Sequence, residues 1–203
     1  MVGGDRIMNK KVGVFLARFQ PLHNGHLYMI EKALKENDKL LIVLGSANKQ
    51  GMVRNPFKLS VRSGWLSESL LDKSDFDRIQ IIELADWSTE TDNEELKEWG
   101  HYLYYNIVAN IKQKTFSIYY NDDLEIIKSW FDDEVNKYIT IEHSKRSHIF
   151  DGLSATKIRQ AIIDEDIEYL NKFLPKPVMD DLEYIKPYLV KVNENPKEDF
   201  SMV

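Results

Sequence analysis

The apolar residues of this chain fall into two kinds of segment, which alternate along most of its length. Segments of the first kind are short and almost wholly apolar, such as "KLLIVLGSA" at residues 39–47, and they predict strands covered on both faces. In the second kind, apolar residues recur every three or four positions, as Leu27, Ile30, Ala33 and Leu34 do, which predicts helices. The expected strands are residues 11–19, 39–47, 77–84, 115–121 and 137–143, and the expected helices are 26–36, 59–71, 94–111 and 124–131.

This alternation predicts an α/β fold, a doubly wound, Rossmann-like five-stranded parallel sheet with right-handed crossovers. The polar stretches 48–58 and 86–93 are expected to be loops. After residue 150 the strand pattern stops, and a C-terminal helical extension is expected. Its helices are predicted at 154–163, at 167–173 and near 178–190, with Pro175 and Pro177 before the last. We expect residues 11–165 to form the α/β domain, residues 166–192 to extend the same compact unit, and residues 1–9 and 193–203 to be loose.

The composition indicates a soluble globular protein and argues against several other classes. With 43% hydrophobic and 30% charged residues, the 203-residue chain reads as a soluble globular protein. Its net charge of -6 argues against broad binding to nucleic acids or to anionic membranes. There is no cysteine, which excludes disulfides and thiolate chemistry. No apolar stretch reaches the length of a membrane span, and residues 1–10 lack the apolar core of a signal peptide, so we expect a cytoplasmic protein.

The first chemistry-bearing stretch is His23-Asn24-Gly25-His26, directly after the first strand. Ligands of parallel α/β sheets bind beyond the carboxyl ends of the strands, where this stretch is expected to lie. A helix start offers unpaired N–H groups and partial positive charge, and glycine permits close approach of a ligand. Two imidazoles three residues apart can donate to phosphate oxygens from one side. There is no GxGxxG after the strand and no GxxxxGK[ST] in the chain, so an ordinary dinucleotide site or P-loop is excluded.

The second stretch is "DGLSATKIRQAI" at residues 151–162, in which Ser154 is a good N-cap. Lys157 occupies the position where a capping box has Glu or Gln, and Arg159 follows it. Cations in a first helical turn oppose the helix dipole. A bound anion would reverse the sign of that effect, so this helix start is a second candidate for phosphate binding.

Together, the stretch from Arg18 to His26 and the later "LSATKIR" (153–159) resemble the HxGH and ISSTxxR motifs of the nucleotidyltransferase superfamily. "GSAN" (45–48), "RNPF" (54–57) and Arg62 resemble, within it, the nicotinamide-mononucleotide adenylyltransferases of the archaeal type. Leu153 and Ala155 depart from the usual second motif, and extra residues stand between GSA and RNPF. Tyr119-Tyr120-Asn121 replaces an archaeal Ser-Gly-Asn, and its tyrosines are expected to reshape the base pocket.

The resemblance implies that a mononucleotide phosphate attacks the α-phosphorus of ATP and releases pyrophosphate, without a protein nucleophile. Mg²⁺ is expected to accompany ATP, with no metal site made by protein residues. The resemblance assigns catalysis to His23, His26 and Arg159. It assigns nucleotide binding to Arg18, Phe19, Gly25, Gly45, Ser46, Arg54, Asn121, Ser154 and Thr156. It assigns the acceptor pocket to Asp86 with Trp87 or Trp99.

Three other functions share parts of this pattern. A cytidylyltransferase acting on a phospho-alcohol has the same HxGH motif and differs in nucleotide preference. A non-catalytic nucleotide-sensing or assembly module would keep the fold. A class I tRNA synthetase also uses an HxGH-type site, but this chain lacks the length for an anticodon domain and the basic surface for tRNA. The expected partners are therefore ATP and a small mononucleotide, with no nucleic acid or membrane, and a homo-oligomer is left open.

Overall fold

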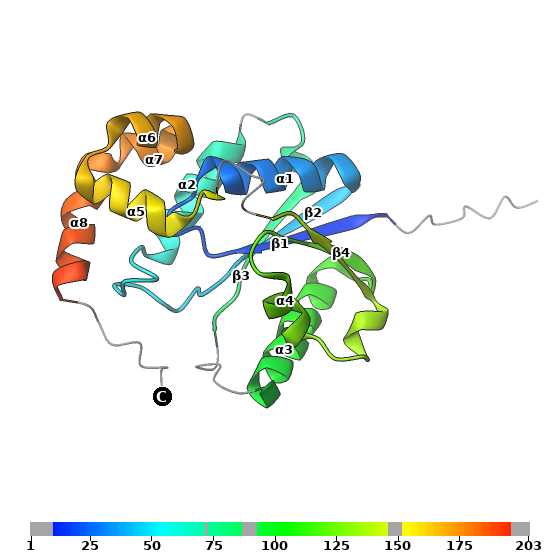
Figure 1. Ribbon diagram of the computed structural model, residues 1–203. Coiled ribbons are helices and arrows are strands. Elements are labelled where there is room, and N and C mark those ends of the chain that lie inside the picture. The colour runs from blue at the N-terminus through cyan, green and yellow to red at the C-terminus, as the bar shows by residue number, and fades with distance from the viewer. Residues whose placement is uncertain (1–9, 72, 87–92, 146–151, 196–203) are drawn as a thin grey trace, which may run out of the picture.

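The structure is a computed structural model that describes residues 10–71, 73–86, 93–145 and 152–195. Its centre is a five-stranded parallel sheet with the strand order β3-β2-β1-β4-β5 (Figure 1). The strands are β1 (Val12–Ala17), β2 (Lys39–Leu44), β3 (Ile79–Glu83), β4 (Phe116–Tyr120) and β5 (Ile139–His143). The expected fold class is confirmed, since the sheet is parallel and helices alternate with its strands.

Helices cover both faces of this sheet. They are α1 (Asn24–Glu36), α2 (Leu59–Leu71), α3 (Asn93–Ile111), α4 (Leu124–Trp130), α5 (Ala155–Asp164), α6 (Ile167–Phe173), α7 (Lys176–Asp180) and α8 (Leu182–Glu194). Short 3-10 turns at Phe76–Arg78 and Val135–Lys137 precede β3 and β5. In Figure 1, α1 and α2 lie on one face of the sheet, and α3 and α4 lie on the other.

Alternate residues of the strands feed two separate cores, as expected where both faces of a sheet are covered. Phe15 points into the first core, together with Met29 and Ile30 of α1. Val14 points into the second core, together with Leu103 of α3. The nearly continuous apolar runs of β1 and β2 follow from this double burial.

The order of the strands defines where a ligand can bind. The central β1 pairs with β2 on one side and with β4 on the other, so that Gly13 lies opposite both Leu40 and Ser117. The chain therefore moves outward in one direction through β2 and β3, and in the opposite direction through β4 and β5. Binding crevices form at the carboxyl edge beside such a reversal, and α1 starts there.

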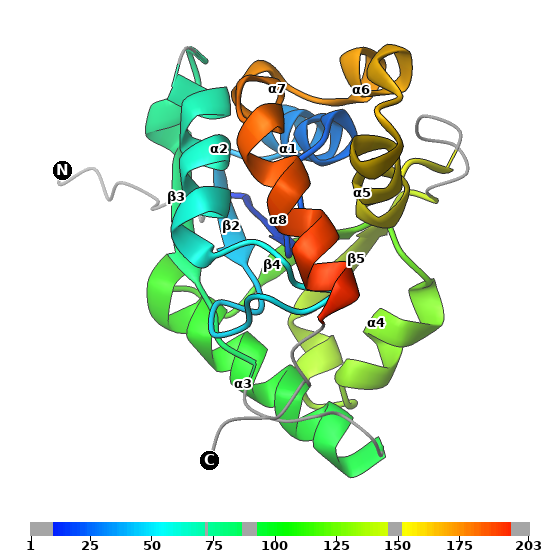
Figure 2. The ribbon, with the colours of Figure 1, turned by 90° about the vertical axis from the view of Figure 1, so that its left-hand side faces the viewer.

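The C-terminal helices pack against the first core rather than standing apart from it. Figure 2 shows α5 to α8 gathered beside α1 and α2. Six buried apolar side chains from α6 to α8 and their connections belong to the same cluster as Phe15. They are Leu170, Phe173, Leu174, Val178, Ile185 and Leu189.

The single helix expected near 178–190 was wrong, because the structure has two helices there. Pro177 lies in the first turn of α7, where a missing N–H costs nothing, and Asp181 ends α7 and precedes α8. The loose tail expected from residue 193 was also placed too early, since α8 continues through Glu194. The expected tail at 1–9 and most of the loop at 86–93 lie outside the described residues.

A search of the described helices for a membrane span found none with the required length and apolar character.

Candidate active site

The connection from β1 to α1 is packed against the first core. Phe19 has a positive φ of 52° and is 1% exposed. Its ring lies 6.0 Å from that of Phe15 and 4.8 Å from that of His26, measured between centroids. The turn that carries the histidines is therefore held by apolar contacts, and Phe19 supports His26 directly.

The two histidines of the turn stack on each other. Their ring centroids are 3.7 Å apart with an interplanar angle of 14°, and His23 and His26 are 4% and 8% exposed. The backbone N–H of His23 donates to Nδ1 of His26 over 3.2 Å. Because Nδ1 accepts, the proton of a neutral His26 ring is on Nε2.

Gly25 makes this stack possible and joins it to the second motif. A Cβ on Gly25 would lie 3.1 Å from both Cε1 and Nδ1 of His23, and 3.4 Å from a methyl group of Leu153. With glycine, the His23 ring can lie over the first turn of α1, and Leu153 can pack beside it. The structure thus brings the HxGH stretch and the stretch before α5 into contact.

Arg159 on α5 reaches back to the same turn. Its Nη1 donates to the carbonyl oxygen of Gln20 over 2.7 Å, and its Nη2 donates to Oγ1 of Thr156 over 3.2 Å. Burial, together with the neighbouring charges of Arg18 and Arg54, lowers the pKa of Arg159 to about 10. Both neighbouring charges have the same sign as its own. Three arginines from three segments therefore concentrate positive charge beside the histidines, which suits an anion such as a polyphosphate.

The start of α5 adds backbone donors. The Oγ of Ser154 accepts from the backbone N–H of Lys157 over 3.3 Å, so Ser154 is the N-cap, as expected. The carbonyl oxygen of Ser154 accepts from the N–H of Ile158 at 3.1 Å. The first-turn N–H groups of Ala155 and Thr156 have no such helical partner, as at any helix start, and are available to a ligand.

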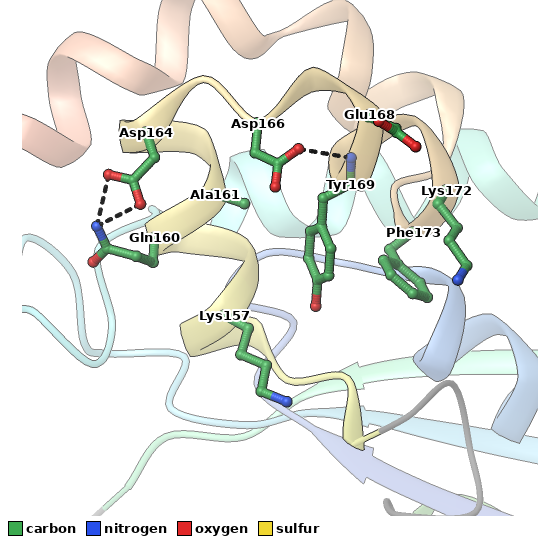
Figure 3. A pocket seen from close by; sticks show the side chains of 9 residues that line it. All are labelled: Lys157, Gln160, Ala161, Asp164, Asp166, Glu168, Tyr169, Lys172 and Phe173. Carbon is green, nitrogen blue, oxygen red and sulfur yellow. Dashed lines mark hydrogen bonds between the residues drawn. The ribbon is translucent and has the colours of Figure 1, made fainter.

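A pocket of about 650 Å³ lies between α5 and α6 (Figure 3). The side chains of Lys157, Tyr169 and Lys172 point downward as drawn in Figure 3, and three carboxylates lie along the upper side of the pocket. The side-chain amide of Asn24 donates to the carbonyl oxygen of Lys172 over 3.1 Å. This contact places the pocket beside the start of α1, so it adjoins the phosphate-binding candidates.

Arg62 holds the strand ends together at the carboxyl edge. It is 0% exposed, and its Nη1 donates to the carbonyl oxygens of Arg18 at 2.8 Å and Gly45 at 2.9 Å. Its Nη2 donates to the carbonyl oxygen of Ser46 at 3.0 Å. Gly45 and Ser46, expected to bind nucleotide, thus lie beside the end of β1. Ser46 has a positive φ of 50°, which turns the chain sharply after β2.

The sequence marked Arg62 only through the resemblance, although a local signal for its burial exists. It lies on the same face of α2 as the buried Trp65, Leu66 and Leu70. Burial lowers the pKa of Arg62 to about 10, and the carboxylates of Asp86 and Glu83 act in the opposite direction. A cation in an apolar helical stripe indicates such a buried role, in which carbonyl oxygens bind the two terminal nitrogens while Nε has no partner among the described residues.

The candidate acceptor residues are placed differently from one another. Asp86 follows β3 and is tied to the GSAN loop: its N–H donates to Oδ1 of Asn48 at 3.0 Å, and the Asn48 amide donates back to its carbonyl at 2.7 Å. Its carboxylate lies 3.4 Å from Nζ of Lys49. Trp99 is 7% exposed and packs in the second core, with its ring edge-on to that of Trp130. Trp87 lies outside the described residues.

The tyrosines at the end of β4 do not reshape the carboxyl edge as expected. The hydroxyl of Tyr119 donates to a carboxylate oxygen of Glu36 at 2.8 Å and accepts from the amide of Asn37 at 2.7 Å. Both partners lie at the far end of α1, so the ring points away from the histidines. Tyr120 is 9% exposed and packs in the second core. Asn121, half-buried, directly follows β4 at the carboxyl edge.

Within the described ranges, no group of three or more His, Asp or Glu side chains is arranged to hold a metal ion. The donors that surround the candidate phosphate site are cations and N–H groups. These suit a phosphate chain, and a divalent ion could be held there by the phosphates and water.

Comparison with known proteins agrees with these observations. A family model described as cytidylyltransferase-like matches residues 14–161. The chain is 30% identical over 175 residues to a nicotinamide-nucleotide adenylyltransferase of Thermococcus sibiricus, covering 86% of this chain and 82% of that protein. It is 36% identical over 92 residues to the protein of the same name from Saccharolobus solfataricus, covering 45% of this chain and 50% of the relative. The chain thus spans about half the length of the first curated relatives that it matches.

Among solved structures, a bifunctional NMN adenylyltransferase/ADP ribose pyrophosphatase from Francisella tularensis, complexed with AMP and a Mn ion, has the same fold. The TM-score is 0.67 at 23% identity, and the match covers 92% of this chain and 53% of that one. The resemblance drawn from the motifs is confirmed at the level of family and fold.

Proposed function

The chain belongs to the cytidylyltransferase-like family, and on that premise we propose that it transfers the adenylyl group of ATP to nicotinamide mononucleotide or its nicotinate form. The products are an NAD-type dinucleotide and pyrophosphate. The observation that carries the proposal is the stacked pair of His23 and His26 on a turn that Arg159 contacts through Gln20, with Arg18 and Arg54 close enough to affect Arg159.

The chemistry requires positioning and charge stabilisation rather than a protein nucleophile. An oxygen of the mononucleotide phosphate forms a bond to the α-phosphorus of ATP, and the bond from that phosphorus to the oxygen of the leaving pyrophosphate breaks. The attacking oxygen is already anionic, so no proton has to be removed from it. Catalysis then depends on alignment of the two phosphates and on donors aimed at the charge that develops.

Each polar group of the site has a place in this scheme. The Nε2–H of His26 would donate to a phosphate oxygen, with His23 stacked beside it. The three arginines would balance the charge of the triphosphate, and the N–H and hydroxyl of Thr156 would bind its outer part. Gly25 would keep the His23 ring in place, because a Cβ there would crowd that ring and Leu153.

A divalent ion brought by ATP would offset part of the phosphate charge, while Arg18, Arg54 and Arg159 would supply the positive charge of the protein itself. The Mn ion in the Francisella tularensis structure supports the use of a divalent ion, and Mg²⁺ is the ion we propose. We propose that the acceptor binds near Asp86, whereas the ring of Trp99 is packed in the second core. We expect the reaction to take place in the cytoplasm.

The experiment is a substrate panel. ATP and CTP are each combined with nicotinamide mononucleotide, nicotinate mononucleotide and two phospho-alcohols, and pyrophosphate release and dinucleotide formation are both measured. We expect turnover with ATP and one of the two pyridine mononucleotides. A clear preference for CTP with a phospho-alcohol would replace the proposal by the cytidylyltransferase alternative. Binding of ATP without turnover of any pair would favour a sensing module.

A further inference from the structure

Arg54 stands at the tip of a short loop whose base determines where its guanidinium lies. The N–H of Gly51 donates to the carbonyl oxygen of Pro56 at 3.0 Å, and Met52 and Asn55 exchange two backbone hydrogen bonds of 3.3 and 3.1 Å. Arg54 is exposed, whereas Asn55 and Pro56 are buried. The loop therefore has an anchored base and a free tip, and movement of the base would move Arg54.

One side of this base is held by Gln20. The N–H of Phe57 donates to Oε1 of Gln20 at 2.9 Å, and the Gln20 amide donates back to the carbonyl of Phe57 at 3.1 Å. Gln20 is 2% exposed, and its own carbonyl accepts from Arg159. A buried, reciprocal pair of this kind tolerates little displacement. Gln20 therefore helps to position two arginines: its side chain holds the base of the Arg54 loop, and its carbonyl oxygen binds Arg159.

The other side of the base is held by the C-terminal helix α8. The hydroxyl of Tyr188 donates to the carbonyl of Pro56 at 2.8 Å, and its ring lies 6.4 Å from that of Phe57. Burial raises the pKa of Tyr188, so its hydroxyl remains a donor through neutral pH. Figure 2 shows this loop, in cyan, running beside α8. Tyr188 lies beyond residues 14–161, the part of the chain that the family model matches.

We propose that Tyr188 is a positioning residue of the nucleotide site, which acts by fixing the loop that carries Arg54. The C-terminal extension then serves two purposes: it completes the first core, and it sets the place of one phosphate-binding arginine. The kinetic consequence rests on the proposed function, whereas the coupling between α8 and the loop does not. The ring of Tyr188 packs against Phe57, and a phenylalanine would do the same. The hydroxyl adds only the hydrogen bond to Pro56, so that bond carries the positioning role.

The test uses Tyr188→Phe, which keeps the ring and removes the hydrogen bond to Pro56. Tyr184→Phe, one turn earlier on α8, is the matched control, because Tyr184 is 84% exposed. We expect Tyr188→Phe to raise the KM for ATP about five-fold, as for loss of one hydrogen bond, with a smaller change in kcat. We also expect faster hydrogen exchange at Gly51 and Phe57. Tyr184→Phe should change neither.

A double-mutant cycle separates positioning from general stability. If Tyr188 acts through Arg54, then Tyr188→Phe has little further effect on KM once Arg54→Ala is present. Additive effects of the two changes, or unchanged exchange in the loop, would overturn the proposal. If the parent protein shows no adenylyl transfer, the same cycle is measured on the Kd of ATP with Mg²⁺ by calorimetry. There, non-additivity supports the role of Tyr188 and additivity overturns it, whatever reaction the protein catalyses.

Discussion

At the scale of single residues, His26 divides two tasks between its ring nitrogens. Nδ1 accepts the N–H of His23 and so helps to close the first turn of α1, and we propose that Nε2 donates to a phosphate oxygen. We expect His26→Ala to lower kcat about 10²-fold or more, because it removes a donor aimed at charge that develops during the reaction. Steady-state kinetics with ATP varied, run beside a thermal melt, measure both consequences.

The control for His26 is His26→Asn. An asparagine side chain can offer an acceptor near the position of Nδ1 but has no group at the position of Nε2. It should recover stability lost in His26→Ala without recovering kcat. Near-normal turnover by a folded His26→Ala protein would contradict the catalytic role and favour the sensing-module alternative.

Substitution of Arg159 is expected to change the kinetics differently from substitution of His26. Its guanidinium is held by Gln20 and Thr156 in the absence of ligand, so its charge is already in place when ATP binds. Arg159→Ala should therefore raise the KM for ATP as well as lower kcat. Arg159→Lys keeps the charge but cannot make the same two-pronged contact, so it should recover only part of the loss. An Arg159→Ala variant with unchanged KM for ATP would exclude a ground-state role.

At the scale of elements, the first turn of α5 carries the positive charge of Lys157, which makes the helix less stable than an acidic residue there would. Lys157 occupies the capping-box position opposite Ser154, where Glu would bond back to the N-cap and suit the helix dipole. Lys157→Glu should raise the free energy of unfolding by about 0.5 kcal/mol. It should also weaken ATP binding, because it places a negative charge beside the phosphate site. Chemical unfolding and calorimetric titration with ATP measure the two effects, and Lys157→Gln separates loss of the cation from gain of the anion.

The α3–α4 side of the molecule carries a pH-sensitive contact. Asp132 accepts from the backbone N–H of Val135 at 3.0 Å and lies 2.8 Å from Nε2 of His101, and these contacts lower its pKa. A carboxyl whose pKa is lowered by folding stabilises the fold above its unfolded pKa, and that contribution is lost as pH falls through the folded value.

Asp132→Asn should therefore reduce the free energy of unfolding at pH 7 by about 0.5 kcal/mol, since the group is largely solvated. The difference from the parent should shrink between pH 7 and about pH 3, as pH falls from the unfolded pKa of Asp132 toward its lowered folded value. Urea unfolding at the two pH values is the measurement. Asp133→Asn is the control, since Asp133 is exposed. A loss that is the same at both pH values would mean that the charge of Asp132 contributes nothing.

Elements with a strong local period were predicted well from the sequence, and contacts between distant segments were not. The helix expected at 59–71 is α2, because its apolar face packs on the core throughout. The start of α1 was placed two residues too late, since His23 serves as N-cap in place of the usual Ser or Asp. The pairing of Gln20 with Phe57 and of Tyr188 with Pro56 joins a side chain to a distant backbone group, and no spacing along the chain records it.

The candidate site likewise was predicted where its motifs are local and not where it depends on contacts between distant segments. Histidine, glycine and arginine positions could be named because their motifs are local, and the structure brings His23, His26, Gly25 and Arg159 together. The direction of the Tyr119 ring depends on the length of α1, which puts Glu36 and Asn37 within its reach. That dependence is tertiary, so the sequence alone suggested a different place for this ring.

At the scale of the whole molecule, the positive site sits in a negative protein. The chain carries a net charge of -6, yet Arg18, Arg54 and Arg159 lie close enough to influence one another. Such an arrangement concentrates positive charge locally in a molecule that is negative as a whole, which suits a small anion better than a long polyanion. The positive charge is concentrated because the fold brings together one arginine from each of three separate segments of the chain.

The C-terminal helices α6 to α8 complete the first core, so we expect the α/β domain to fold only together with them. Six apolar side chains after Glu165 are buried in the first core, each 5% exposed or less. At about 1.5–3 kcal/mol for each buried side chain, they contribute roughly 10 kcal/mol or more, which matches the usual net stability of a domain, about 5–15 kcal/mol. A chain ending at Glu165 should therefore show no cooperative thermal transition and should bind a hydrophobic dye, while a chain ending at Asn195 should melt like the parent. Circular dichroism and dye fluorescence on the two truncations test this. A cooperative transition of the shorter chain near the parent temperature would show that residues 11–165 fold alone, and the extension would then be an accessory rather than part of the core.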